Sequence, residues 1–191
     1  MDDIRKSIAG IFGRKDLGYT FAGTGFLVEG GLVLTCAHVI QDAAMVGEKA
    51  VTFQFEGETR IRTGKIVALS PEDGLDIAVL RPTIAPQGIP FLPLKFSVNS
   101  RGNKFSAFGY PQKGGFTGLH GIGNVLGQVR DNKKRDVLEI SSNQVTHGFS
   151  GCPVWDEKEK AVIGMVNCGF DFGYDRPLGD VSFAIPVEII K

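Results

Sequence analysis

Short apolar runs bounded by glycine- and proline-containing turns recur along the chain from residue 21 onward. β-Branched and aromatic residues are frequent in these runs, and several runs alternate apolar with polar positions, as half-buried strands do. Because no crossover helix separates the runs, they favour antiparallel β-barrels. The pattern predicts strands at 21–28, 32–35, 50–55, 60–69, 75–80, 104–108, 121–129, 137–141, 153–155, 162–168 and 181–185.

The first residues instead repeat their apolar side chains at helical spacing. Ile4, Ile8, Ile11 and Phe12 would share one face of a helix. The spacing therefore predicts a short amphipathic helix over 3–12. Such a helix would either pack on the surface of its own domain or dock another domain or subunit.

Turns and a connector divide the rest of the chain. The four prolines of 81–94 cannot donate to a sheet ladder, so this segment is expected to join two barrels. The charged run 131–136 lies between two strand patterns and is predicted to be an exposed hairpin tip. The expected organisation is a helical segment at 1–18, a first barrel at 19–94 and a second barrel at 95–191.

Composition narrows the classes of partner and compartment. With 21 basic and 21 acidic residues, the formal net charge is zero, which gives no reason to expect a nucleic acid or an anionic membrane as partner. No stretch reaches the roughly 18 apolar residues of a membrane span, and the acidic N-terminus lacks a signal-peptide core. Three cysteines, an odd number without framework spacing, suit reduced thiols. We therefore expect a cytoplasmic protein.

Three motifs contain candidate catalytic residues, in the order histidine, aspartate, serine. Taken alone, His38 could be a core histidine, Asp76 a turn cap and Ser150 a loop hydroxyl. Together, and in the chain order of a known triad, they indicate a serine nucleophile with its base and orienting acid. Asp73 suits the acid role less well, because no apolar strand follows it directly. The motifs are Thr35-Cys36-Ala37-His38, Gly74-Leu75-Asp76-Ile77-Ala78-Val79-Leu80 and His147-Gly148-Phe149-Ser150-Gly151-Cys152-Pro153-Val154.

These motifs resemble those of trypsin-like serine peptidases of the chymotrypsin fold, most of all the bacterial HtrA/Deg and effector-associated domains. The segments 23–28, 32–39 and 182–186 share the resemblance, which extends from about Phe21 to Pro186. It implies an all-β fold of two six-stranded antiparallel Greek-key barrels, here with a short N-terminal helix. The active site would lie in the cleft between the barrels.

The resemblance also implies a role for each motif residue. Ser150 would be the nucleophile, His38 the general base and then acid, and Asp76 the acceptor that orients the imidazole. The N–H groups of Gly148 and Ser150 would form the oxyanion hole. Phe149 departs from the zymogen-type members, which have an aspartate at this position. Activation by N-terminal trimming is therefore not expected, and ordering of the loop by a partner is a hypothesis.

The specificity pocket follows from the resemblance alone. Gln144 would lie at its base and the branched Val181 would shorten it, which suits a small or apolar residue before the cleaved bond. Asp180 or Asp171 reaching the pocket would instead select arginine or lysine, and both alternatives remain open. The full set expected to line the pocket is Gln144, His147, Asn167, Cys168, Gly169, Asp180 and Val181.

The sequence therefore predicts a cytoplasmic serine endopeptidase without cofactor or metal, since Cys36 and Cys152 lack the spacing of metal ligands and suit core packing. Its partners would be protein or peptide substrates and a regulatory or sensor domain of a longer chain, of which this domain would be the effector. The alternatives are a catalytically silent binding module, an esterase-like hydrolase and an HtrA-like quality-control protease.

Overall fold

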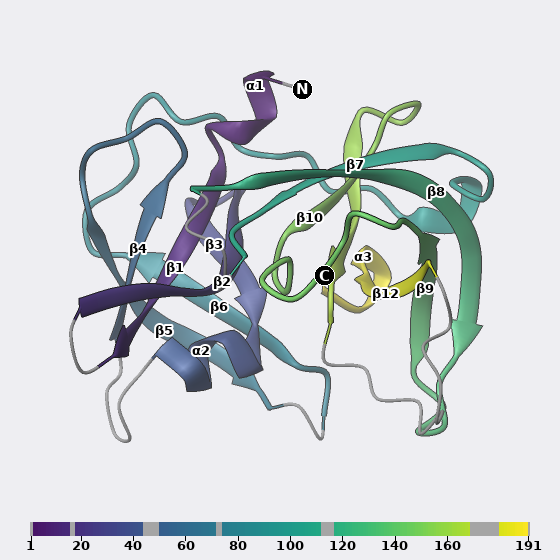
Figure 1. Cartoon of the computed structure of the whole chain (residues 1–191), viewed down its shortest axis with the longest axis horizontal. Coiled ribbons are helices and arrows are strands. Elements are labelled where there is room, and N and C mark those ends of the chain that lie inside the picture. Colours follow the sequence, from purple (N-terminus) through teal and green to yellow (C-terminus); the bar gives the residue numbers. More distant parts are fainter. Residues whose placement is uncertain are drawn as a thin grey trace.

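The computed structural model describes residues 2–15, 18–43, 50–71, 74–111, 117–168 and 180–190. Their strands form two closed antiparallel barrels that lie side by side (Figure 1). The all-β, two-barrel fold expected from the sequence is thereby confirmed. In this described part of the chain, no helix is long and apolar enough to cross a membrane.

The first barrel closes in the strand order β1-β2-β3-β6-β5-β4. Its hairpins use the turns that the sequence predicted at 29–31 and 56–58, where Gly30, Gly31 and Gly57 have positive φ angles. The strands are β1 (Ile8–Lys15), β2 (Gly18–Val28), β3 (Leu32–Cys36), β4 (Ala50–Phe55), β5 (Arg62–Ser70) and β6 (Ile77–Pro82).

The second barrel closes in the order β10-β11-β12-β9-β8-β7. The longest strand, β8, curves along one side of this barrel (Figure 1). The strands are β7 (Lys104–Gly109), β8 (Leu119–Arg130), β9 (Asp136–Ser141), β10 (Pro153–Asp156), β11 (Ala161–Val166) and β12 (Val181–Pro186).

The N-terminal segment differs from the sequence prediction. The helix predicted over 3–12 is present only as α1 (Asp2–Arg5), and Ile8–Lys15 instead form β1, which pairs with β2 and β4. Two glycines, Gly10 and Gly13, disfavour a helix here, and β-branched isoleucines favour a strand. Ile8 and Ile11 are fully buried as part of the first barrel.

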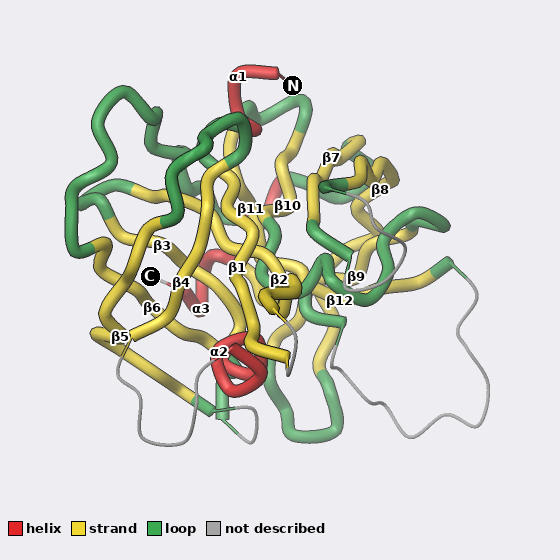
Figure 2. Tube along the Cα trace, turned by 60° about the vertical axis from the view of Figure 1, so that its left-hand side comes forward, coloured by secondary structure: helices red, strands yellow, loops and turns green. Residues whose placement is uncertain are grey.

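Short helices complete the described chain: α2 (Ala37–Ala43), the 3₁₀ helix η1 (Ser97–Asn99) and α3 (Val187–Ile190). The sequence pattern did not predict α2, which begins directly after β3 and contains His38. It packs against β1 and β2 of the first barrel (Figure 2). The short β3–α2 junction thus places His38 at one end of the barrel.

One apolar core runs through the first barrel and across the barrel interface. Phe26 and Phe53 of the first barrel belong to the same buried cluster as Trp155, Val162 and Met165 of the second. Burying one such side chain stabilises a fold by about 1.5–3 kcal/mol. The two barrels are therefore held together by continuous apolar packing, which fixes any site shared between them.

The hairpin tip between β8 and β9 is less exposed than predicted. Asn132, Lys133 and Lys134 are exposed, but Asp131 is buried and Arg135 half-buried. Asp131 accepts from the Arg135 guanidinium at 2.6 Å and from the Lys133 and Arg135 amides. The Arg135 guanidinium also donates to the carbonyl of Gly74, in the first barrel. Burial of Asp131 is therefore compensated by hydrogen bonds, and the tip joins the two barrels.

Candidate active site

His38 and Asp76 are joined by two hydrogen bonds at the edge of the first barrel. Nδ1 of His38 lies 2.7 Å from Oδ2 of Asp76, and the His38 backbone N–H donates to Oδ1 at 2.9 Å. Asp76 is 1% exposed and His38 is 21% exposed. A carboxylate only accepts, so the neutral imidazole donates from Nδ1 and has its lone pair on Nε2, as a general base requires.

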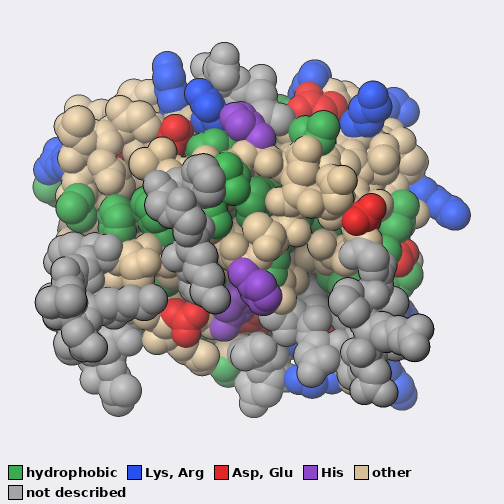
Figure 3. All heavy atoms as spheres, viewed as in Figure 1, with side chains coloured by type: hydrophobic (Ala, Val, Ile, Leu, Met, Phe, Trp, Pro, Cys, Tyr) green, Lys and Arg blue, Asp and Glu red, His purple; other side chains and the backbone are tan. Residues whose placement is uncertain are grey.

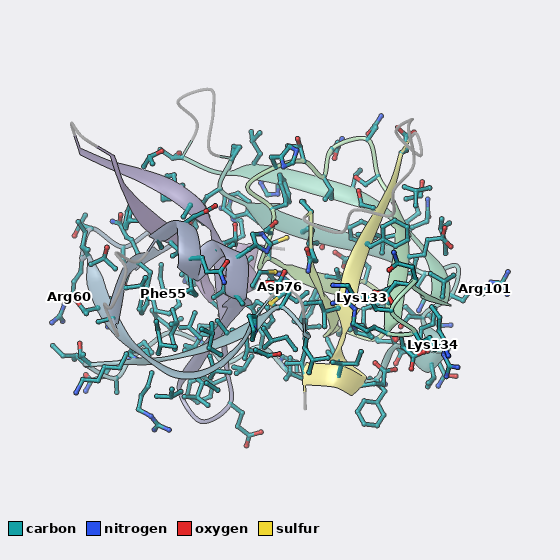
Figure 4. The ribbon with its side chains drawn as sticks, turned by 90° about the horizontal axis from the view of Figure 1, so that it is seen from below. Phe55, Arg60, Asp76, Arg101, Lys133 and Lys134 are labelled. Atoms are coloured by element: carbon teal, nitrogen blue, oxygen red, sulfur yellow. The ribbon has the colours of Figure 1, made fainter. Side chains whose placement is uncertain are left out.

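The turn before β6 gives Asp76 this orientation. Its backbone has a φ of +56°, a conformation that aspartate tolerates better than most residues. Its N–H donates to the carbonyl of Pro71, and its own carbonyl accepts from the N–H of Ala37. Figure 4 shows Asp76 between the two barrels, with Lys133 and Lys134 of the hairpin tip on the side of the second barrel. Asp73, the alternative acid, lies outside the described residues.

The second barrel also contributes to the Asp76 carboxylate. The side-chain amide of Asn167 donates to Oδ2 at 2.7 Å, and Asn167 is 3% exposed. Asn167 was expected to line the specificity pocket; the structure gives it this contact with Asp76. A carboxylate buried between barrels needs such donors, because desolvation penalises its charge.

Ser150 shares one pocket with His38, although the two residues come from different barrels. The pocket has a volume of about 170 Å³ and is lined by Ala22, His38, Asp42, His147, Gly148, Ser150 and Cys168. The hydroxyl oxygen of Ser150 accepts from the Cys168 backbone N–H at 3.2 Å. On the face seen in Figure 3, histidine side chains reach the surface where the two halves of the molecule meet. The arrangement places a hydroxyl and an imidazole at one open hollow.

The residues before Ser150 form a tight turn. Phe149 N–H donates to the Thr146 carbonyl at 3.0 Å, and Gly148, the third residue of the turn, has a φ of +99°. His147 has a negative φ, so the turn is type II. Such a turn requires glycine or asparagine as its third residue, here Gly148. Compared with a type I turn, the His147–Gly148 peptide is flipped, which reverses the direction of the Gly148 N–H. Among the described residues, no backbone carbonyl accepts from the Gly148 or Ser150 N–H, and the Ser150 backbone instead hydrogen-bonds the Cys168 thiol.

Thr24 of β2 holds this turn against the first barrel, a role that sequence reasoning missed. Its hydroxyl donates to the Gly148 carbonyl at 2.9 Å and accepts from the Tyr110 N–H at 3.0 Å. Its backbone N–H donates to the Ser150 carbonyl at 2.9 Å. The one sequence signal was a threonine between Gly23 and Gly25 in an otherwise apolar strand.

Gly151 explains how the backbones approach so closely. A Cβ atom at this position would lie 2.0 Å from the Thr24 carbonyl oxygen, and its φ is +86°. Only glycine satisfies both conditions.

Phe149 is a structural anchor in the second barrel. The side chain is fully buried in the cluster formed with Phe105, Leu138 and Ile163. An added Cβ at Gly109 would lie 2.8 Å from its ring, and one at Gly121 would lie 3.1 Å from it. These glycines thus leave the space that the ring fills, and packing in the second barrel fixes this residue.

The residues expected to line the specificity pocket are only partly brought together. His147 and Cys168 line the catalytic pocket, whereas Gln144 is exposed and accepts from the Ile122 N–H at 3.1 Å. Val181 pairs with Ser141 in the sheet, and the carbonyl of the exposed Asp180 accepts from Ser142. Gly169 and Asp171 lie outside the described residues.

The cysteines near the site are neutral thiols in packed surroundings. Burial raises the pKa of Cys168 to about 11, and it raises the pKa values of Cys36 and Cys152 well above the usual range. Cys36, His38 and Asp76 place ligand-type atoms within 4.8 Å of one another. However, the Cys36 thiol donates to the Val166 carbonyl at 3.4 Å and is fully buried. This set therefore does not fit a metal centre, because the thiol would have to lose its proton in an apolar interior.

Three proteases are among the solved structures that are similar over nearly the whole chain. The Rv3671c protease from M. tuberculosis, in its active form, has 22% identity and a TM-score of 0.75, with 98% of this chain and 78% of that chain covered. Deg5 has 24% identity and a TM-score of 0.74, with 99% and 87% covered. The serine endoprotease from Yersinia pestis has 20% identity and a TM-score of 0.72, with 99% and 61% covered. These likenesses establish the fold.

No curated protein matches the sequence. The trypsin-like peptidase domain matches residues 23–165, a segment that includes His38, Asp76 and Ser150. With this match over most of its length, the chain belongs to the family of trypsin-like peptidase domains.

Proposed function

We propose that the chain is a serine endopeptidase that hydrolyses peptide bonds through His38, Asp76 and Ser150. Membership of a peptidase family supports serine protease activity in general. The observation that carries the residue assignment is the 2.7 Å bond between His38 and Asp76 beside a pocket that also contains Ser150. A hydroxyl needs such a base, because at neutral pH it is a weak nucleophile.

The reaction would begin with attack of the Ser150 hydroxyl oxygen on the substrate carbonyl carbon. Nε2 of His38 takes the hydroxyl proton, and Asp76 stabilises the resulting imidazolium. The negative oxygen of the tetrahedral intermediate accepts hydrogen bonds from the Gly148 and Ser150 N–H groups. Losing one such donor typically costs about 2.7–4 kcal/mol of barrier.

The intermediate then collapses as the carbon–nitrogen bond breaks. His38 gives its proton to the leaving amine, and the acyl group remains on Ser150 as an ester. Water attacks this ester with His38 again acting as base, which releases the acid and restores the serine. No cofactor takes part in this proposed sequence.

The conformation of the turn bears on regulation. Gly148 already has a positive φ, and Thr24 already holds its carbonyl. This arrangement favours a chain that reacts without an activating partner, in contrast to the hypothesis that a partner orders the loop. Protein or peptide substrates are the proposed partners. We also propose that the domain acts as the protease effector of a longer chain.

Labelling with a fluorophosphonate probe tests the function. We expect one adduct on the native chain, none on Ser150→Ala and strongly slowed labelling of His38→Ala, as read by intact mass. Hydrolysis of an amide peptide by the same chain, compared with the matching ester, would separate a peptidase from an esterase. A folded native chain that forms no adduct would support the silent binding module instead.

A further inference from the structure

A second hollow borders the first barrel, and the proposed mechanism does not use it. It has a volume of about 280 Å³, and its lining residues include the partly buried Phe21, the buried Phe55 and Tyr110, and the acidic residues Glu56 and Glu58. The acids lie on the turn between β4 and β5, whereas Tyr110 directly follows β7 of the second barrel. The hollow is therefore built by both barrels, as the catalytic pocket is.

The two carboxylates in this hollow are not equivalent. Glu58 is neutralised by Arg62, whose Nε and Nη2 atoms lie 2.8 and 2.7 Å from its two oxygens. The carboxylate of Glu56 accepts a hydrogen bond from the Tyr110 hydroxyl at 2.7 Å, its one side-chain hydrogen bond in the described part of the chain. A phenol is neutral, and burial together with this bond raises the pKa of Tyr110 above its ordinary range. The charge of Arg5 also acts on the Tyr110 hydroxyl, but no hydrogen bond or ion pair within the described chain joins Glu56 to a cation.

Cationic side chains of the chain itself already lie on the neighbouring rings. The guanidinium carbon of Arg62 is 5.7 Å from the centre of the Phe55 ring, and that of Arg5 is 5.6 Å from the centre of the Phe108 ring. Between these two ends, the rings of Phe21 and Tyr110 lie 4.7 Å apart. Aromatic faces attract cations through their quadrupole. Of these rings only that of Phe21 is partly exposed, and with the Glu56 carboxylate at the same hollow it suits one further cation.

The hollow lies next to the catalytic pocket along β2. Phe21 lines the hollow, and the adjacent residue Ala22 lines the pocket that contains Ser150. Tyr110 is bonded through its N–H to Thr24, which holds the Gly148 carbonyl. Consecutive residues of an extended chain are about 3.3 Å apart. A peptide that occupies the catalytic pocket would therefore reach the hollow within a few residues.

We propose that this hollow binds the side chain of a lysine or arginine a few positions away from the cleaved bond of a peptide substrate. The inference rests on the proposed function and adds a second determinant of specificity to it. The charged group pairs with Glu56, and the aliphatic stem packs on the partly exposed Phe21. This site is separate from the pocket for the residue directly before the cleaved bond.

Peptides that differ in a single charge test the proposal. Pairs of substrate peptides are made that differ only in having lysine or norleucine at one position. Each pair places this residue at a different distance from the cleaved bond, on one side or the other. Norleucine keeps the aliphatic stem and removes the ammonium group. For the native chain, lysine at one position should raise kcat/KM by about tenfold over norleucine.

Two variants assign that gain to Glu56. Glu56→Gln keeps an acceptor for Tyr110 and should abolish the gain, while the norleucine peptide is cleaved as by the native chain. Glu29→Gln makes the same charge change in the exposed turn between β2 and β3 and should keep the gain. Equal rates for lysine and norleucine at every position, or a gain that persists in Glu56→Gln, would overturn the proposal.

Titration of the full chain with n-butylammonium, followed by NMR, separates this inference from catalysis. Saturable chemical-shift changes of the Phe21 and Gly57 amides are expected for the native chain. They should be absent when n-butylammonium is added to Glu56→Gln, and when neutral n-butanol is added to the native chain. These shifts on a chain that cleaves no peptide would support the cation site and overturn the proposed function. Peptide cleavage without these shifts would overturn the cation site alone.

Discussion

The side-chain amide of Asn167 and the side chain of His38 donate to the same oxygen of Asp76, each at 2.7 Å. His38 and Asp76 belong to the first barrel, and Asn167 follows β11 of the second. The second barrel therefore completes the environment of a pair that the first barrel brings together. Two donors on one buried oxygen hold the carboxylate in a single orientation.

Replacement of Asn167 should impair catalysis more than binding. Hydrogen bonds to charged groups contribute about 1.5–3 kcal/mol, so Asn167→Ala should lower kcat by about 10- to 100-fold. KM should change little, because the lost bond orients Asp76. Steady-state kinetics checks this, with the exposed Asn143→Ala as the control. A native kcat in Asn167→Ala would show that this bond does not support the reaction.

Thr24 offers a sharper test of the turn before Ser150. Thr24→Val keeps the shape of the side chain but removes the donor to the Gly148 carbonyl and the acceptor for the Tyr110 N–H. We expect fluorophosphonate labelling to slow by about tenfold or more. Thr24→Ser keeps the hydroxyl and should restore most of the rate. If valine and serine variants label equally fast, the hydroxyl has no part in holding the turn.

Gly109 tests the packing of Phe149. The Cβ of Gly109→Ala would lie 2.8–3.0 Å from the Phe149 ring and Cα atom, so the turn must shift. We expect a fall in kcat of about 100-fold, comparable to losing one oxyanion donor. Gly121→Ala, with its nearest contacts at 3.1 and 3.2 Å, should have a milder effect. The two variants are compared by kinetics and thermal unfolding, and a larger loss in Gly121→Ala would contradict the expected order.

Acid should weaken the hairpin tip that joins the barrels. Burial acts to raise the pKa of Asp131, but hydrogen bonds from Arg135 and Lys133 outweigh it and lower that pKa below its ordinary value of 3.8. Because the pKa of Asp131 is lower in the folded chain than in the unfolded chain, its charge stabilises the fold at pH values above the unfolded pKa. This contribution is lost as the pH falls through the folded pKa.

Asp131→Asn should therefore be less stable than the native chain at pH 7, and the difference should shrink below about pH 4. Urea unfolding at several pH values measures it. Asp136→Asn removes the ion pair with Arg130, whose side chains are 51% and 74% exposed, so it should have almost no effect on stability at any of these pH values. A stability difference for Asp131→Asn that does not depend on pH would contradict the assignment.

Cys168 should react with iodoacetamide only under alkaline conditions. Burial raises its pKa to about 11, so at pH 8 about one thiol in a thousand is ionised. The alkylation rate should increase about tenfold per pH unit up to the pKa, and the adduct should block the pocket that Cys168 lines. Peptide mapping measures the alkylation of Cys168, and an activity assay measures the block of the pocket. Fast labelling of Cys168 at pH 7 would be incompatible with this environment.

The strands and the order of the candidate residues could be predicted from the sequence because both are local signals. Alternation and glycine-rich turns identify strands without knowledge of their partners, as the alternating strand β4 illustrates. The first strand was predicted incorrectly because the spacing of Ile8, Ile11 and Phe12 fits a helix as well as a short strand. Pairing with β2 and β4 decides between the two, and the sequence pattern contains no information on pairing.

The supporting contacts could not be predicted, because they join residues far apart in the sequence. Thr24 and Gly148 are separated by 124 positions, and Asp76 and Asn167 by 91. A threonine in an apolar strand and an asparagine at a strand end have many ordinary explanations. Only the docking of the two barrels gives these residues their partners. The same holds for the hollow around Glu56, since Tyr110 comes from the opposite barrel.

Each sheet closes on itself, so every strand in the two barrels has a hydrogen-bonded neighbour on both sides. An open strand edge would attract other extended chains and promote aggregation. Closure removes that hazard for a protein whose proposed substrates are themselves extended polypeptides. We expect a substrate to bind instead at short irregular segments beside the barrels, such as the one that contains Asn167 and Cys168. The segments that would bind a substrate are therefore different from the strands, whose edges could otherwise pair with another copy of the chain.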